Sequence, residues 1–111
     1  MVIFKFRHKS AEFSLNVFEC KTILQKASGL MFRRKSGSLL FHFKKYTREP
    51  IHSFFCVPFL AIWFCDEKIV DFRYVKPWQL SVRSRKKFNK LLEIPNTDEK
   101  FAFFLDKFRK I

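Results

Sequence analysis

The chain has 111 residues, which is the length of one domain around a single core. Hydrophobic residues make up 48% and aromatic residues 19%, so a disordered chain is excluded, because such chains lack the apolar surface that offsets ordering entropy. The 23 Lys and Arg against 10 Asp and Glu give a net charge of +13. This charge predicts nucleic acid or an acidic protein as a candidate partner. The alternative is that the charge only keeps a Phe-rich domain soluble.

The cysteines and the apolar segments indicate a cytoplasmic protein. Cys20, Cys56 and Cys65 have no C-x-x-C spacing, which argues against a disulfide framework and favours a reducing compartment. The N-terminal apolar run contains charges and does not resemble a signal peptide. The longest apolar run, Phe54 to Cys65, contains Pro58 and is shorter than the roughly 20 residues of a spanning helix. We therefore expect no membrane span.

The first third of the chain predicts two strands and a helix. Residues 2–7 and 13–19 alternate between apolar and polar side chains, as strands with one wet face do, and residues 8–11 between them form a turn. Thr22 and Gln25 have the spacing of a capping box. The sequence therefore predicts a short helix over residues 23–28, ended by Gly29.

The middle of the chain predicts further short strands between polar loops. The predicted loops are residues 33–38 and 46–50, and Asp66-Glu67-Lys68 is predicted to be a hairpin turn. The predicted strands are residues 39–43, 51–55, 60–65, 69–75 and 91–94. The predicted core residues are Phe54, Phe55, Ile62, Phe64, Val70 and Phe72, with Leu30 and Phe32 docked against them.

The C-terminal residues 101–111 are compatible with either a helix or a strand. Phe101, Phe104 and Phe108 lie at helical spacing, and Asn96 or Thr97 is a candidate cap for such a helix. Asp98 and Glu99 suit the positive end of that helix. Phe101, Phe103 and Leu105 also alternate as in a strand.

These segments predict the fold class. About seven short strands with one helix are typical of a mostly β domain, here a small antiparallel barrel-like domain that comprises residues 1–111. Closure of the sheet would remove the exposed edges that Phe-rich strands otherwise present.

The order of several short motifs resembles the family called Domain of Unknown Function 192, especially its short archaeal members. The similarity covers about residues 13–111, and the motifs are Gly29-Leu-Met-Phe-Arg33, His52-Ser-Phe-Phe55, Ala61-Ile-Trp-Phe-Cys-Asp66, Lys68-Ile-Val70, Val75-Lys-Pro77, Leu91-Leu-Glu-Ile-Pro95 and Asp106-Lys-Phe108. The resemblance implies a barrel-like β fold with an early helix and no assigned activity. It also implies a helical turn near residues 97–101 followed by a final strand. The chain departs from the family pattern at Ala61, where the family has an acid, and at Leu105, where it has a glycine.

The basic residues form three segments that are candidates for polyanion binding. Their members are Arg33, Arg34, Lys35, Lys44, Lys45, Arg83, Arg85 and Lys87. In an extended segment, Arg83, Arg85 and Lys87 would share one face. Tyr46 and Trp78 lie close to these segments in the sequence and are candidates for stacking on bases. The alternative is a solvated loop face with both rings in the core.

The signals for catalysis and for metal binding are weak. The sequence lacks G-x-S-x-G, a phosphate-binding glycine loop and H-E-x-x-H, so no catalytic residue is assigned. His42, His52 and Asp71 are the candidates for lining a pocket, if the protein is an enzyme of unrecognised type. The Cys and His residues do not have the spacing of a zinc site, and neither a metal nor a cofactor is predicted.

Overall fold

The computed structural model describes residues 2–20, 37–51, 57–79 and 81–108. Most of the described residues lie in strands, as predicted. The elements are β1 (Val2–His8), β2 (Ala11–Cys20), β3 (Ser38–Thr47), β4 (Phe59–Cys65), β5 (Lys68–Val75), β6 (Phe88–Pro95) and the helix α2 (Phe101–Phe108). The helix expected over residues 23–28 lies outside the described residues. None of the described helices is long and apolar enough to cross a membrane.

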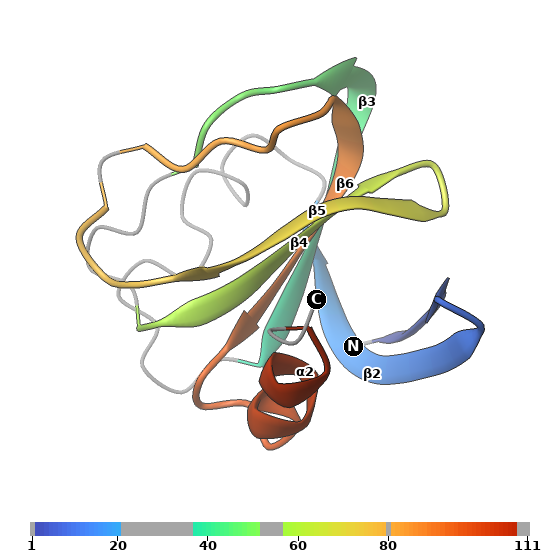
Figure 1. Cartoon of the computed structure of the whole chain (residues 1–111), viewed down its shortest axis with the longest axis vertical. Coiled ribbons are helices and arrows are strands. Elements are labelled where there is room, and N and C mark those ends of the chain that lie inside the picture. Colours follow the sequence, from blue (N-terminus) through green and yellow to red (C-terminus); the bar gives the residue numbers. More distant parts are fainter. Residues whose placement is uncertain (1, 21–36, 52–56, 80, 109–111) are drawn as a thin grey trace.

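The six strands form one curled sheet, a half-barrel, in the order β1-β2-β3-β6-β4-β5 (Figure 1). All neighbouring pairs are antiparallel except β2 and β3, which run parallel with Val17 opposite Ser38. A parallel pair needs a connection that returns the chain to the starting end of the first strand. Residues 21–37 lie between these two strands in the sequence, and the predicted antiparallel arrangement holds for the other four pairs but not for this one.

Both predicted hairpin turns are present. Lys9 and Ser10 join β1 to β2 with φ angles of 51° and 67°, so two consecutive residues adopt the positive φ of a type I′ turn. Asp66 and Glu67 join β4 to β5, and Asp66 has a φ of 58°. These turns fix the register of the two hairpins.

Two predicted strand boundaries differ from the structure. β3 extends to Thr47, which was expected in a loop, and β6 begins at Phe88 and not at residue 91. The cause is the pairing of Thr47 with Phe88, which buries the Phe88 ring. Ile51 forms an isolated bridge with Val82 in place of the start of a strand. Residues 52–55 of that predicted strand lie outside the described residues.

The inner face of the sheet carries the first hydrophobic core. Phe6, Phe13 and Phe64 come from three strands, and Phe104 and Phe108 come from α2, which packs against this face. The helical alternative for residues 101–108 is therefore correct, because the helix places Phe104 and Phe108 in the core and leaves Phe103 exposed. The final strand implied by the family resemblance does not form over these residues.

Polar contacts hold the start of α2 against the sheet. The Asp98 carboxylate accepts a hydrogen bond from the Lys100 amide at 2.9 Å. The same carboxylate accepts one from the buried Ser38 hydroxyl at 2.8 Å. Asp98 therefore caps the start of the helix by accepting from a backbone amide that has no partner within the helix. The sequence had indicated Asn96 or Thr97 for this role. The bond to Ser38 ties this point to the beginning of β3.

A second core covers the outer face of the central strands. It contains Phe59, Trp63, Phe88 and Leu91, all of which are at most 1% exposed. Because β4 is covered on both faces, its sequence reads as a continuous apolar run. Ile62 and Phe64 are buried as predicted. Val70 and Phe72 are only half-buried because β5 is an edge strand, and Leu30, Phe32, Phe54 and Phe55 lie outside the described residues.

The different burial of two phenylalanines predicts different costs of truncation. Phe64→Ala should lower the free energy of unfolding by about 3–5 kcal/mol, since the ring is fully buried. Phe72→Ala should cost about half as much, because part of its ring already contacts water. Urea unfolding of both variants measures the difference. Equal losses would contradict the burial described here.

Candidate functional site

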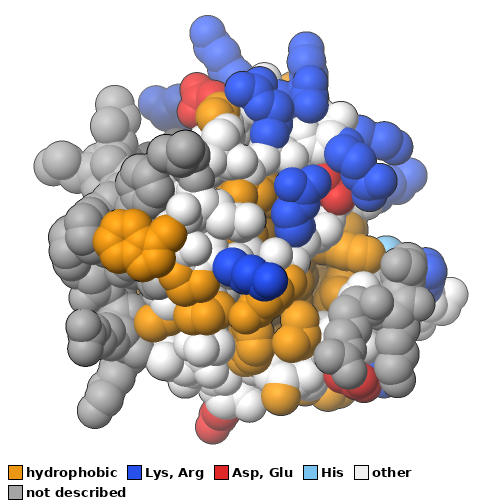
Figure 2. All heavy atoms as spheres, turned by 60° about the vertical axis from the view of Figure 1, so that its left-hand side comes forward, with side chains coloured by type: hydrophobic (Ala, Val, Ile, Leu, Met, Phe, Trp, Pro, Cys, Tyr) orange, Lys and Arg blue, Asp and Glu red, His pale blue; other side chains and the backbone are white. Residues whose placement is uncertain are grey.

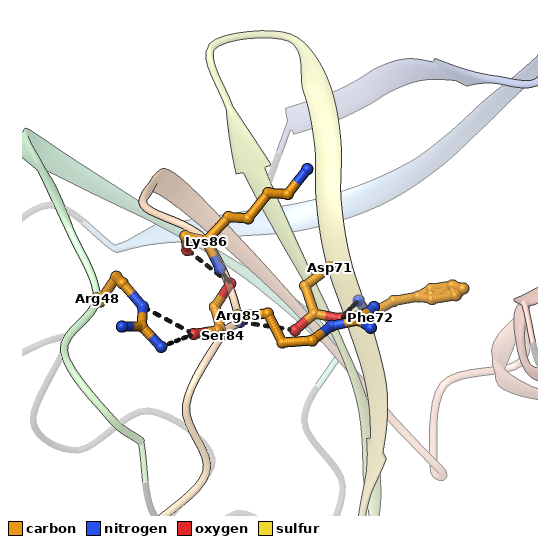
Figure 3. Close-up of polar contacts among 6 residues, drawn as sticks. All are labelled: Arg48, Asp71, Phe72, Ser84, Arg85 and Lys86. Atoms are coloured by element: carbon orange, nitrogen blue, oxygen red, sulfur yellow. Dashed lines mark hydrogen bonds and ion pairs between the residues drawn. The ribbon is translucent and has the colours of Figure 1, made fainter.

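Two basic segments that lie almost forty residues apart in the sequence meet at one end of the sheet. Thr47 at the end of β3 pairs with Phe88 at the start of β6. One residue further, the Arg48 guanidinium donates two hydrogen bonds to the Ser84 carbonyl, at 3.2 and 3.0 Å (Figure 3). These contacts place the residues around Lys44 and Lys45 beside residues 83–87.

The exposed cations of both segments form what we call the β3–β6 basic surface. Its members are Lys44, Lys45, Arg48, Arg83, Arg85, Lys86 and Lys87, and all are solvent-exposed. Figure 2 shows Lys and Arg side chains gathered over the upper part of one face of the molecule, with some acidic side chains among them. Arg33, Arg34 and Lys35, the remaining basic candidates, lie outside the described residues.

Arg85 and Asp71 anchor this segment to β5. The Asp71 side chain is 2% exposed, and its carboxylate lies 3.1 Å from the Arg85 guanidinium. It also accepts hydrogen bonds from the backbone amides of Arg85 and Phe72, both at 2.9 Å (Figure 3). A buried carboxylate needs such partners to offset the loss of hydration. Asp71 therefore holds residues 84–86 in place.

Among the unengaged cations of the surface are Arg83, Lys86 and Lys87, which lie close together on one segment. Their side chains form no hydrogen bond or ion pair with any residue that the structure describes. The predicted alternation holds from Val82 to Arg85, where Val82 and Ser84 are buried and Arg83 and Arg85 are exposed. A hydrogen bond from the Ser84 hydroxyl to the Lys86 carbonyl, at 2.8 Å, bends the chain next, so that Lys86 is exposed too.

Both candidate stacking residues are exposed, in contrast to the core alternative. Tyr46 is 53% exposed, and its hydroxyl donates a hydrogen bond to Asp66 at 2.7 Å. This bond and the carboxylate charge raise the pKa of Tyr46. Trp78 is 61% exposed and has a φ of 64° directly after Pro77. In a type II turn the residue after the proline needs this positive φ and is usually glycine. Trp78 therefore adopts a strained backbone conformation.

The two described pocket candidates, His42 and Asp71, lie on different strands and have different partners. The His42 Nε2 atom lies 2.7 Å from a Glu19 carboxylate oxygen, an ion pair between β3 and β2 when the ring is protonated. Asp71 lies on β5 with Arg85, and His52 lies outside the described residues. In the described part of the chain, no three His, Cys, Asp or Glu side chains are grouped as metal ligands.

Glu93 is a buried acid that the sequence reasoning did not single out. It lies on β6 between Leu39 of β3 and Ala61 of β4 and is 6% exposed. Burial raises its pKa from 4.5 to about 8, so the side chain is mostly neutral at pH 7. The sequence does contain a sign of this burial, because Glu93 is the one acid within the apolar run Leu91-Leu-Glu-Ile-Pro95, and such a run is typical of a strand covered on both faces.

This pKa predicts how stability depends on pH. Between pH 4.5 and about 8 the folded protein keeps a proton that the unfolded chain has released, so the free energy of unfolding falls as the pH rises. The slope approaches about 1.4 kcal/mol per pH unit at most. Glu93→Gln should remove this slope and stabilise the protein most at pH 7 to 8. Urea unfolding at several pH values tests this, and parallel curves for both proteins would contradict it.

Comparisons with known proteins identify structures of the same fold. A protein of unknown function from Novosphingobium aromaticivorans has a TM-score of 0.74 and 18% identity, over 91% of this chain and 75% of that one. A protein from Sinorhizobium meliloti, described as a putative transcription regulator, has a TM-score of 0.75 and 17% identity, over 94% of this chain and 84% of that one. No protein-family model and no curated protein matches the chain. At these identities the fold alone is shared.

Proposed function

We propose that this domain binds single-stranded nucleic acid, without strong sequence preference, through the β3–β6 basic surface. The main support for this proposal is that two basic segments meet in one surface. The pairing of Thr47 with Phe88 and the Arg48–Ser84 hydrogen bond join them. Clustered Lys and Arg side chains neutralise phosphates and release bound counterions, which provides the affinity.

The shape of the molecule favours a single strand over a duplex as the ligand. α2 buries Phe104 and Phe108 against the sheet, and its exposed face carries Phe103 and Asp106 beside Lys107, so it lacks the basic face of a helix that enters a DNA groove. The basic side chains come from a strand end and an irregular segment, and the candidate stacking ring of Trp78 is exposed in the turn that follows β5. Nothing in this arrangement reads base edges, so little sequence preference is expected.

Two further observations support the proposal from outside the site. The net charge of +13 favours a polyanionic partner, and the S. meliloti protein with this fold is described as a putative transcription regulator. The ordered motifs also lead us to propose membership of the Domain of Unknown Function 192 family, since two of them lie on the paired strands β4 and β6. Cys20 and Cys65 form no disulfide among the described residues, which agrees with the cytoplasmic location that we propose.

The salt dependence of binding to a short single-stranded oligonucleotide tests this function. Wild-type protein should bind at about 50 mM salt and lose affinity steeply as salt rises. The variant Arg83→Glu, Lys86→Glu, Lys87→Glu should lose most of this affinity. Its slope of log K against log salt should be shallower by about 2, because each phosphate contact contributes about 0.7 for a single strand. Arg85 is left unchanged because its loss would leave Asp71 without its partner.

A matched control separates this surface from total charge. Lys9→Glu, Lys100→Glu, Lys107→Glu changes the net charge by the same amount, at exposed positions near α2. Its binding should stay close to that of wild type. If both triple variants lose affinity equally, or if wild type does not bind at low salt, the proposal is wrong. Equal or tighter binding of polyglutamate would favour an acidic protein as the partner.

Trp78→Gly tests stacking separately from charge. Glycine adopts a φ of 64° without strain, so the change removes the ring while relieving the backbone. The affinity for the oligonucleotide should fall by about 1–3 kcal/mol with an unchanged salt slope, since no phosphate contact is lost. A melting curve verifies the fold. Unchanged affinity would exclude Trp78 from the interface.

A further inference from the structure

A cleft of about 380 Å³ lies between β1 and the hairpin of β4 and β5. This volume is within the range of small-molecule sites in proteins. We call it the β1–β4 cleft, and the lining residues that matter here are Phe4, Phe6, Phe64, Asp66, Glu67 and Lys90. In Figure 1 both hairpins that border it, β1–β2 and β4–β5, lie on the right-hand side of the sheet.

The apolar wall of the cleft consists of aromatic rings. Phe6 and Phe64 are buried, and Phe4 is half-buried above them. The Phe4 ring lies 5.6 Å from Phe6 and meets Phe64 edge-on at 5.5 Å, distances between ring centroids. Phe4 is therefore supported from below and still has ring surface available to a ligand. A flat aromatic ligand suits such a wall.

The polar wall offers hydrogen-bond donors and acceptors together. Lys90 is half-buried, and its ammonium group has no hydrogen bond or ion pair with any residue in the described ranges. Two acids, Asp66 and Glu67, line the same cleft. The Tyr46 hydroxyl donates a hydrogen bond to the Asp66 carboxylate at 2.7 Å and fixes its position. The lining also contains Lys5, Arg7 and Glu12, so its three cations and three acids balance and it has no net attraction for a simple anion. A neutral ring with donors and acceptors on its edge fits this lining, and nucleobases have these properties.

The rim of the cleft is hydrogen-bonded to the two strands that carry the β3–β6 basic surface. Lys87 directly precedes β6 and Lys90 is the third residue of that strand, so their Cα atoms are about 10 Å apart along the extended chain. Tyr46, on the β3 side of the surface, bonds Asp66 at the rim, and Asn89 of β6 accepts from the Asp66 amide at 2.9 Å. Tyr46 and Asn89 thus connect the strands that carry the basic surface to Asp66 at the rim of the cleft.

We propose that the β1–β4 cleft takes up one unpaired base of a strand bound on the basic surface. This inference rests on the proposed function and adds the part of the ligand that the site recognises. The base lies against Phe4, Lys90 donates to an acceptor on its edge, and the acids opposite accept from its amino or imino groups. The phosphates stay on the exposed cations outside.

An abasic oligonucleotide separates base uptake from phosphate binding. The two probes are an oligothymidylate and a strand of the same length and charge in which every base is missing. All proteins carry Trp78→Gly, so that stacking on that ring does not contribute. With an intact cleft, the base-containing strand should bind about five- to a hundredfold tighter than the abasic one. Phe4→Ala and Lys90→Gln should each reduce the ratio of the two affinities towards one. The affinity of Lys90→Gln for the abasic strand measures the effect of the lost charge alone.

Ile3→Ala is the matched control for Phe4→Ala, because Ile3 is the neighbouring residue on β1 and is 66% exposed. It should keep the ratio of the intact cleft. If Phe4→Ala unfolds the protein, Lys90→Gln alone decides. An unchanged ratio in the cleft variants, with both strands still bound, overturns the inference and leaves the proposed function standing. Absence of binding to either strand overturns both.

Discussion

The packing of α2 against the inner face of an open sheet is the interaction on which the rest of the structure depends. β1 and β5 are the two edges of the sheet and do not pair with each other, so the apolar inner face is not closed by hydrogen bonds. Phe108 contacts rings of β1, β2 and β5, and it therefore connects both edges through one side chain. A half-barrel of Phe-rich strands is stable in water only when such a helix covers its opening. The same packing holds β1 opposite β4, where the cleft lies.

The local elements of the fold were predictable from the sequence, and the long-range pairings were not. Alternation placed the strands and both hairpin turns, because period-two burial is a local property. The apolar side chains of residues 101–108 fit both the spacing of a helix and the alternation of a strand. Only the packing of Phe104 and Phe108 in the core decides for the helix. The parallel pairing of β2 with β3 depends on a crossover, which local patterning does not encode. For the same reason the sequence identified the two basic segments without indicating that they are neighbours.

The burial of Asp71 illustrates where alternation misleads at the candidate site. In the sequence, Asp71 and Arg73 occupy the wet face of a hairpin, and Arg73 is indeed exposed. Asp71 is buried because residues 84–86 cross over it, and the chain supplies Arg85 and two amides as its partners. The cations of the basic surface consequently differ in role. Arg48 and Arg85 hold the segment in position, while Arg83, Lys86 and Lys87 remain available to phosphates.

The placement of the two tryptophans gives the protein a built-in optical reference. Trp63 is fully buried on β4, and Trp78 is 61% exposed in a turn. Their indole emission should differ in wavelength and in accessibility to a soluble quencher such as iodide, because one ring is enclosed in the core and the other is largely exposed to water. Quenching of the exposed ring alone reports events at the surface. A change in the buried ring reports rearrangement of the core, so ligand contact and loss of fold are distinguishable in one unlabelled sample.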